Sequence, residues 1–373
     1  MYPNILILTC GFGEGHNAAA RNLRDAFQEL PEPPNVLMVD ILDLAHPKFG
    51  KFLKRAYTTI ITHFPQWWAR FYARSDRMKL KKRRGRVDIL FRITGKLKDL
   101  LQHFQPDAVV STYPLYAHLL LRLREKNEIT IPPLFTVITD SISINKLWTS
   151  APSDWFFVAD PYSAKRVASH GVPLEQIIIT GFPVSPEFSI LKKEAKLQEG
   201  PPWRILFFPA TKEQEFRETL NTLGSVLDEG AELTLPLGRN YERLMPTVAT
   251  YQAEHPKRCV KALNWTNQIP KMLFQNHLVI GKAGGATTHE VLAASCPMVI
   301  NYVIPGQEEG NAELLSVSGC GIRTYDPDQV ASAVREILNP YTGLRKKMCD
   351  AMLLLGKPDA ASVAAKFVLD HIL

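Results

Sequence analysis

The sequence lacks the features of several protein classes. No apolar run approaches the ~18 uncharged residues that span a bilayer. The apolar residues 5–8 lead straight into glycines, which indicates a buried strand and a turn rather than a secretory signal. The five cysteines are scattered and form no C-x-x-C pair, so we expect reduced thiols in the cytosol and no zinc site. No P-loop Lys-Ser/Thr follows the glycine-rich segments, and NTP hydrolysis is therefore not expected.

What is present is the composition of a folded protein larger than one ordinary domain. Of the 373 residues, 46% are apolar and 22% are charged, which excludes a disordered chain and a coiled coil. At about 150 residues per domain, the length predicts two domains.

Positive charge is concentrated in one segment. The chain carries a net charge of +7, but residues 51–98 hold fifteen Lys or Arg and only two acidic residues, a net +13, so the remainder is net −6. The same segment is rich in aromatic side chains, namely Phe52, Tyr57, Phe64, Trp67, Trp68, Phe71 and Tyr72.

Interleaved basic and aromatic residues are typical of two binding surfaces. Nucleic acid offers phosphates and bases that stack on rings, and an anionic membrane offers charged headgroups at the depth that Trp prefers. A solvated helix with a packed aromatic face is the third interpretation. The context of the segment favours the membrane, so nucleic acid is not expected as a partner. The predicted membrane contacts are Lys54, Arg55, Trp67, Trp68, Arg70, Lys81, Lys82, Arg83 and Arg84.

Short apolar runs alternate with helical patterns along the whole chain. Strands are predicted at residues 4–9, 36–41, 108–111, 134–139, 156–159 and 177–180, and again at 204–208, 231–235, 258–263, 278–281 and 298–301. Helices are predicted at residues 17–30, 115–126, 213–227 and 361–373. This alternation is typical of α/β proteins with doubly wound parallel sheets.

A proline-rich stretch at residues 181–186 and a polar stretch at 192–202 divide the pattern in two. We therefore predict an N-terminal domain over residues 1–182, a C-terminal domain over 183–355, and a last helix within 356–373 that packs back towards the N-terminal domain. Ligands of such sheets bind at the carboxyl ends of the strands, so a cleft between the two domains is the expected site.

The first glycine-rich loop, GFGEGHN at residues 11–17, follows a predicted strand and opens a predicted helix. Gly13 and Gly15 let the backbone approach a ligand closely, and with Asn17 they are candidate substrate contacts. His16 at the start of the helix is suited to the role of general base. Its alternatives are a capping role or a hydrogen-bonding role in the wall of the site.

The second loop, GKAGGATTHE at residues 281–290, also joins a strand to a helix. Bare N–H groups at a helix start bind anions, and a diphosphate fits there. Glu290 is placed to accept hydrogen bonds from a ribose diol. The alternative is a helix start capped by Thr287 and Glu290. The candidate donor contacts are Lys282, Gly284, Gly285, Thr287, Thr288 and Glu290.

The third loop, IPGQEEGN at residues 304–311, follows the strand predicted at 298–301. Gln307 and Glu308 present both donors and acceptors, which suits the hydroxyl groups of a sugar. An ordinary polar loop is the alternative interpretation.

Together these loops resemble glycosyltransferase family 28, and within it the monogalactosyldiacylglycerol synthase and diacylglycerol glucosyltransferase branch. The resemblance rests on ILILTCGFGEGHNAAARNLRDAF, VITDSISINKLW, FFVADPYSAKRVASHGVPLEQIIITGFPVSPEF and GKAGGATTHEVLAASCPMVINYVIPGQEEGNAELL. It implies a GT-B fold, with two doubly wound domains facing each other across a cleft, the second binding a UDP-sugar and the first a lipid acceptor.

The resemblance also implies residue roles. His16 would be the base, and Asp140 would orient or assist it. Gln307 and Glu308 would hold the hexose. In addition, Asn311 would support the loop, and Trp265 and Ile269 would flank the uracil-binding turn.

The function implied is an inverting transfer of a hexose from a UDP-sugar to diacylglycerol or a related lipid, at the cytoplasmic face of a membrane and without a metal or other cofactor. One alternative is a lipid II synthase-like N-acetylglucosaminyltransferase. The others are a UDP-sugar epimerase and an inactive binding homologue.

Overall fold

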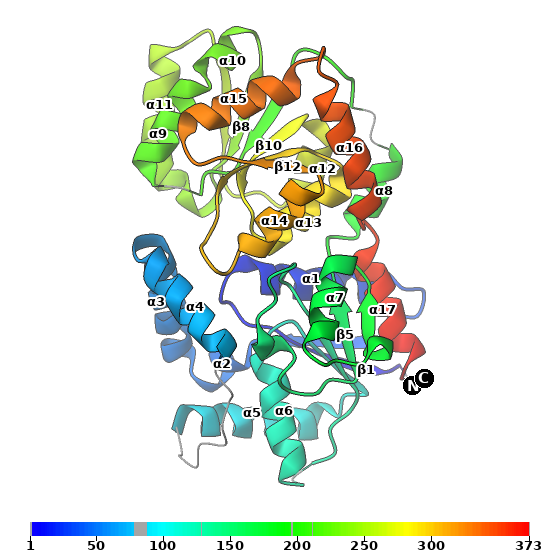
Figure 1. The fold of residues 1–373 in the computed structure, drawn as a ribbon. Helices are drawn as coiled ribbons and strands as arrows, with labels where there is room; N and C mark the ends of the chain where they lie inside the picture. The colour runs from blue at the N-terminus through cyan, green and yellow to red at the C-terminus, as the bar shows by residue number, and fades with distance from the viewer. Residues whose placement is uncertain (1, 78–87, 128, 195–196, 211, 373) are drawn as a thin grey trace. The chain divides into compact units, whose positions relative to one another are not determined.

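The structure is a computed structural model that describes residues 2–77, 88–127, 129–194, 197–210 and 212–372 (Figure 1). By their internal contacts these residues form two units. The first unit comprises Met1–Pro186, Pro305–Gly310 and Asp359–Leu373, and the second comprises Glu187–Ile304 and Asn311–Pro358. The chain therefore passes between the two units four times, because both the short segment Pro305–Gly310 and the last residues belong with the first unit.

The first unit contains a sheet of six parallel strands in the order β2-β1-β3-β4-β5-β6. The order reverses direction between β1 and β3, which are neighbours. The strands are β1 (Asn4–Leu8), β2 (Asn35–Val39), β3 (Ala108–Ser111), β4 (Leu134–Val137), β5 (Trp155–Val158) and β6 (Ile177–Ile179).

The alternation of side chains in β1 explains how helices cover both faces of this sheet. Ile5 and Ile7 are buried in one apolar cluster, and Leu6 and Leu8 are buried in another, because successive side chains of a strand point to opposite faces. The first cluster includes α1 (Glu14–Gln28) and α17 (Ala360–Asp370), which pack together through small residues such as Ala364.

The remaining helices of the first unit include the basic and aromatic segment. They are α2 (Ile41–Ala45), α3 (Pro47–His63), α4 (Pro65–Arg77), α5 (Asp88–Phe104), α6 (Leu115–Glu125) and α7 (Pro161–Ser169), with 3-10 turns η1 (Lys146–Trp148) and η2 (Leu174–Gln176). The described residues of the segment 51–98 thus lie mainly in α3, α4 and α5. Ile41, which we expected in a strand, starts α2 because the Asp40 side chain caps that helix.

The second unit contains another sheet of six parallel strands, in the order β12-β11-β10-β7-β8-β9. This is the 3-2-1-4-5-6 order of dinucleotide-binding folds, with its switch point between β7 and β10. The strands are β7 (Arg204–Phe207), β8 (Glu232–Pro236), β9 (Cys259–Leu263), β10 (Leu278–Lys282), β11 (Met298–Tyr302) and β12 (Gly321–Arg323).

The helices of the second unit are α8 (Glu187–Glu194), α9 (Glu213–Thr222), α10 (Gly224–Asp228), η3 (Gly238–Asn240), α11 (Tyr241–Glu254), α12 (Ile269–Gln275), α13 (Gly285–Ala294), α14 (Glu309–Val317), α15 (Pro327–Leu338) and α16 (Leu344–Leu355). The single helix expected at residues 213–227 is divided in two. At the division Gly224 leaves room for the Arg258 guanidinium, which a Cβ would touch at 2.7 Å. The stretch expected as a polar linker at 192–202 begins within α8.

Candidate functional site

The first part of the candidate site lies at the carboxyl ends of β1, β3 and β4, next to the switch point of the first sheet. The loop after β1 turns at Gly13, whose φ of +90° is a conformation that favours glycine. Gly13 also stands at the N-cap of α1, with no side chain capping the helix. This turn places His16 in the first turn of α1, beside the residues that follow β3 and β4.

His16 is buried, with 9% of its surface exposed. Its Nδ1 lies 2.9 Å from the Thr139 hydroxyl, and its ring packs edge-on against Tyr113 at 5.1 Å. Burial lowers the pKa of His16 to about 4, because the charged imidazolium loses its hydration. The ring is therefore neutral near pH 7, which is the state that a general base requires.

Asp140 follows Thr139 and is held by two donors from different elements. The indole N–H of Trp148 donates to its Oδ2 at 2.8 Å, and the Tyr72 hydroxyl donates to the same oxygen at 3.4 Å. Burial raises the pKa of Asp140 to about 6, and the two hydrogen bonds oppose part of that rise. The carboxylate remains mostly ionised at neutral pH.

His16 and Asp140 do not share a hydrogen bond in the described part of the chain. Thr139 is the side-chain partner of His16 instead, and Trp148 and Tyr72 are those of Asp140. In this arrangement Asp140 does not orient the His16 ring directly. It contributes a negative charge to the wall of the same cavity.

That cavity has a volume of about 490 Å³ and lies within the first unit. Its wall is formed mainly by apolar and aromatic side chains, with a few polar groups that include His16 and Asp140. Such a lining, apolar with a few polar groups, is typical of a small-molecule binding site. The lining residues are Phe12, His16, Leu53, Ala56, Tyr57, Ile60, Trp68, Tyr72, Tyr113, Pro114, Asp140, Asn145, Leu147, Trp148 and Gln307.

The adjacent tryptophans of α4 have different environments. Trp67 is 71% exposed, whereas Trp68 lines the cavity and packs edge-on against Tyr57 at 5.1 Å. Phe52 of α3 and Phe64, between α3 and α4, are exposed as well.

The basic residues among the predicted membrane contacts also differ in exposure. Arg55 and Arg70 are exposed. Lys54 is only 22% exposed and forms ion pairs with Asp40 at 2.7 Å and with Asp43 at 2.5 Å. Its ammonium group is therefore paired within the first unit. Lys81, Lys82, Arg83 and Arg84 lie outside the described residues.

The other two candidates in the glycine loop differ in their contacts. Asn17 accepts a hydrogen bond from the Thr9 hydroxyl at 2.9 Å, which fixes its amide against the end of β1. A Cβ at Gly15 would meet nothing within 4 Å, so at this position the backbone is open to an approaching group.

The second part of the candidate site is the start of α13, after β10 at the switch point of the second sheet. Gly284 is the N-cap, and no side chain caps the helix, so the alternative in which Thr287 is the cap is wrong. The first N–H groups of a helix have no partner within it, and the helix dipole favours an anion there. Thr287 lies in this first turn, and the Thr288 hydroxyl is buried without a hydrogen-bond partner among the described residues.

Side chains from neighbouring elements support this helix start. Asn311 of α14 donates from its amide to the Ala283 carbonyl oxygen at 3.0 Å. Lys282 ends β10, and Glu290 lies on α13. Trp265, in the loop after β9, is 69% exposed and therefore accessible for stacking, and Ile269 begins α12 close behind it.

Gln307 and Glu308 follow β11 but belong to the first unit by their contacts. Gln307 lines the cavity and accepts a hydrogen bond from the Tyr57 hydroxyl at 2.8 Å. Glu308 is buried, with 5% exposed.

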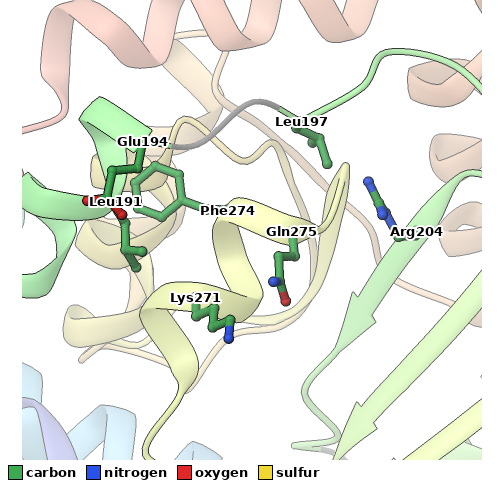
Figure 2. Close-up of a pocket in the computed structure, with 7 residues that line it drawn as sticks. All are labelled: Leu191, Glu194, Leu197, Arg204, Lys271, Phe274 and Gln275. Carbon is green, nitrogen blue, oxygen red and sulfur yellow. The ribbon is translucent and has the colours of Figure 1, made fainter.

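A second cavity of about 300 Å³ lies in the second unit between α8, α12 and the start of β7. In Figure 2, Lys271 and Gln275 project from α12, and Arg204 marks the beginning of the strand. This is the amino end of β7, so the cavity is separate from the carboxyl edge where nucleotides bind to such sheets.

Within the described residues, no three His, Cys, Asp or Glu side chains form a group that would hold a metal ion. The acidic pair Asp326 and Asp328 stands at a helix start, where the Asp326 side chain accepts from the Gln329 N–H of α15 at 2.8 Å. No helix in the described ranges has the length and apolar character needed to cross a membrane.

Comparison with known proteins finds the family that the resemblance indicated. The family model of monogalactosyldiacylglycerol synthase matches residues 16–184, which include His16 and Asp140. A processive diacylglycerol beta-glucosyltransferase of Bacillus thuringiensis is 27% identical over 99% of this chain and 94% of its own. Monogalactosyldiacylglycerol synthase 3 of Arabidopsis thaliana is 26% identical over 95% of this chain and 78% of its own. The chain is therefore similar to this branch of glycosyltransferase family 28 over nearly its whole length.

Solved structures of low sequence identity share the fold. The UDP co-structure of S. aureus MnaA matches with a TM-score of 0.65 at 14% identity, over 100% of this chain and 96% of the other. Acinetobacter baumannii MurG matches with a TM-score of 0.64 at 14% identity, over 99% of both chains. The protein therefore has the two-domain GT-B fold.

Four residues of the site were missed by sequence reasoning: Tyr57, Tyr72, Thr139 and Trp148. Thr139 and Trp148 lie in VITDSISINKLW, one of the segments that resemble the family, so the resemblance could have indicated them. Tyr57 and Tyr72 were recognised only as aromatic residues of a surface segment, because nothing in their spacing indicates that they turn inward.

Proposed function

We propose that the chain transfers a hexose from a UDP-hexose to diacylglycerol, with inversion at the anomeric carbon. The observation that carries this proposal is the aromatic cavity of about 490 Å³ with His16 and Asp140 in its wall. It suits an acceptor that is apolar except for one reacting hydroxyl group. The full-length relatives named for diacylglycerol glucosyl transfer and monogalactosyldiacylglycerol synthesis support the same acceptor.

In the proposed reaction, His16 takes the proton of the acceptor hydroxyl. The acceptor oxygen then forms a bond to the anomeric carbon as the bond to the diphosphate oxygen breaks, and UDP leaves with the electron pair. The negative charge of Asp140 stabilises the imidazolium that forms on His16. The N–H groups at the start of α13 stabilise the charge that grows on the diphosphate.

We also propose that the exposed side chains of α3 and α4 hold the enzyme on an anionic membrane surface. Trp67, Phe64, Arg55 and Arg70 are all exposed, in α3, in α4 or between these two helices. Each basic residue near such a surface contributes about 1 kcal/mol, and exposed aromatic rings enter the headgroup region.

The test is UDP release from UDP-glucose and from UDP-galactose by the purified chain, with diacylglycerol in anionic vesicles. We expect His16→Ala to lower the rate about 10²- to 10⁴-fold and to leave UDP binding unchanged. His255→Ala, at the end of α11 in the second unit, is the matched control and should keep the wild-type rate.

Each alternative has its own outcome in this assay. Full activity of the His16→Ala variant would remove that residue from the mechanism. Release of UDP only with a polyprenyl diphosphate acceptor would favour the lipid II synthase-like function. Conversion of the UDP-sugar without any acceptor would favour an epimerase.

A further inference from the structure

Tyr57 occupies the place in the first unit where three segments meet. It belongs to α3, and its ring packs edge-on against Phe12 of the glycine loop at 5.7 Å and against Trp68 of α4 at 5.1 Å. Its hydroxyl donates to Gln307 Oε1 at 2.8 Å. Tyr57 therefore lines the cavity and is hydrogen-bonded to the segment Pro305–Gly310.

That segment is docked closely on the same unit. Gly306 has a φ of +81°, and a Cβ there would lie 3.4 Å from the Ala69 Cα of α4. A Cβ at Gly310 would collide with the Ser141 carbonyl oxygen. Because both glycines allow close backbone contact, the position of Gln307 is set by α4 and by the chain after Asp140.

We propose that Tyr57 is a positioning residue whose hydroxyl fixes the Gln307 carboxamide, so that the amide nitrogen faces the hexose of the donor. This inference rests on the proposed function and on the role that the family resemblance implies for Gln307, which is contact with the hexose. A carboxamide that rotates exchanges a donor for an acceptor. A hydrogen bond to its oxygen selects one orientation, and with it the hexose hydroxyl groups that can be bound.

The chemistry of Tyr57 suits a permanent donor. Burial raises the pKa of Tyr57 to about 12, so the phenol keeps its proton at any physiological pH. The packing of the ring between Phe12 and Trp68 restricts the direction in which the hydroxyl points. Phenylalanine at this position would keep the packing and remove only the hydrogen bond.

The test compares the binding of UDP, UDP-glucose and UDP-galactose to the full chain by calorimetry, together with kcat/KM for both sugars. We expect Tyr57→Phe to weaken the binding of the preferred UDP-hexose about fivefold, the effect of one lost hydrogen bond. The variant should also discriminate less between the two sugars. Binding of UDP itself should not change, because UDP has no hexose. Gln307→Ala should show the same pattern, and the double variant should lose no more than Gln307→Ala.

Two control variants separate positioning from a general structural effect. Tyr162→Phe, on the exposed side of α7, should behave as the wild type. Tyr72→Phe removes the same atom from the neighbouring helix and should leave the discrimination between hexoses unchanged. Additive losses in the double variant, or unchanged hexose binding by Tyr57→Phe, would overturn the inference. A wild-type chain that binds no UDP would instead overturn the proposed function.

Discussion

The indole nitrogen of Trp148 donates to Asp140 Oδ2 at 2.8 Å, and this bond ties a 3-10 turn to the carboxylate of the candidate site. Asn145 caps that turn by accepting from the Leu147 N–H at 2.9 Å. The carboxylate is therefore held by the segment that follows it in the chain. Its two donors oppose part of the pKa rise that burial causes, and they leave Asp140 titrating near pH 6.

This arrangement predicts the acid side of the pH profile. The rate should fall as the pH drops through about 6, because Asp140 then takes a proton and its charge is lost. His16 does not set this limb, since its pKa of about 4 keeps it neutral throughout the range. In Asp140→Asn the overall rate should be lower, and the limb near pH 6 should be absent. Measuring kcat against pH for both proteins checks this, and a limb that stays near pH 6 in the variant would assign it to another group.

The same two groups predict opposite effects of pH on stability. The folded-state pKa of His16 lies below its ordinary value of 6.5, so the unfolded chain binds the proton more tightly and stability is lost as the pH falls from 6.5 towards 4. Asp140 has a raised pKa, so the folded state binds the proton more tightly and stability is gained as the pH falls from 6 towards 3.8. In the wild type the two contributions largely cancel, each being about 3 kcal/mol at most.

Single variants should reveal each contribution. Between pH 7 and pH 4.5, His16→Gln should become more stable relative to the wild type, and Asp140→Asn should become less stable. Urea unfolding at the two pH values gives the free energies. If the free energy of unfolding depended on pH equally in the wild type and both variants, neither His16 nor Asp140 would be as deeply buried in solution as it is in the structure.

The membrane surface gives a third prediction. Trp67→Ala should weaken binding to vesicles about tenfold, the loss expected for one large apolar side chain, whether the vesicles are neutral or anionic. Arg70→Ala should weaken binding about fivefold to anionic vesicles and leave neutral ones unaffected. Trp265→Ala is the matched control, because Trp265 is equally exposed but lies in the second unit. Equal losses for both tryptophans in vesicle flotation would contradict a surface confined to α3 and α4.

The sequence predicted most of the fold because its strands are short apolar runs bounded by glycine or proline. The doubly wound class and the GT-B fold are confirmed. The predictions failed where a local side-chain contact outweighed the pattern. Asp40 ends a strand by capping a helix, and Gly224 divides a helix where the Arg258 guanidinium lies against it.

The site was less predictable, for a physical reason. A glycine-rich loop between a strand and a helix indicates that the backbone approaches a ligand closely. His16 and Gly284 could therefore be found from the sequence. Tyr57 and Tyr72 face inward because of how α3 and α4 pack on the glycine loop and on Asp140. The orientation of these helices depends on tertiary contacts that no spacing along the chain records. Lys54 was placed on the outer surface for the same reason, although its charge is paired with Asp40 and Asp43.

Thr288 gives the last prediction, in which the same variant changes stability and binding in opposite directions. Its hydroxyl is buried in α13 without a hydrogen-bond partner in the part of the chain that the structure describes. An unsatisfied buried hydroxyl costs about 1–3 kcal/mol, so Thr288→Val, which keeps the shape of the side chain, should leave the empty protein as stable or more stable. If the hydroxyl serves the diphosphate, the variant should bind UDP about fivefold more weakly. Thermal unfolding with and without UDP measures both effects. A Thr288→Val protein that is less stable when empty and shows the full UDP-induced shift would assign Thr288 to the packing of the helix and leave the anion to the backbone N–H groups alone.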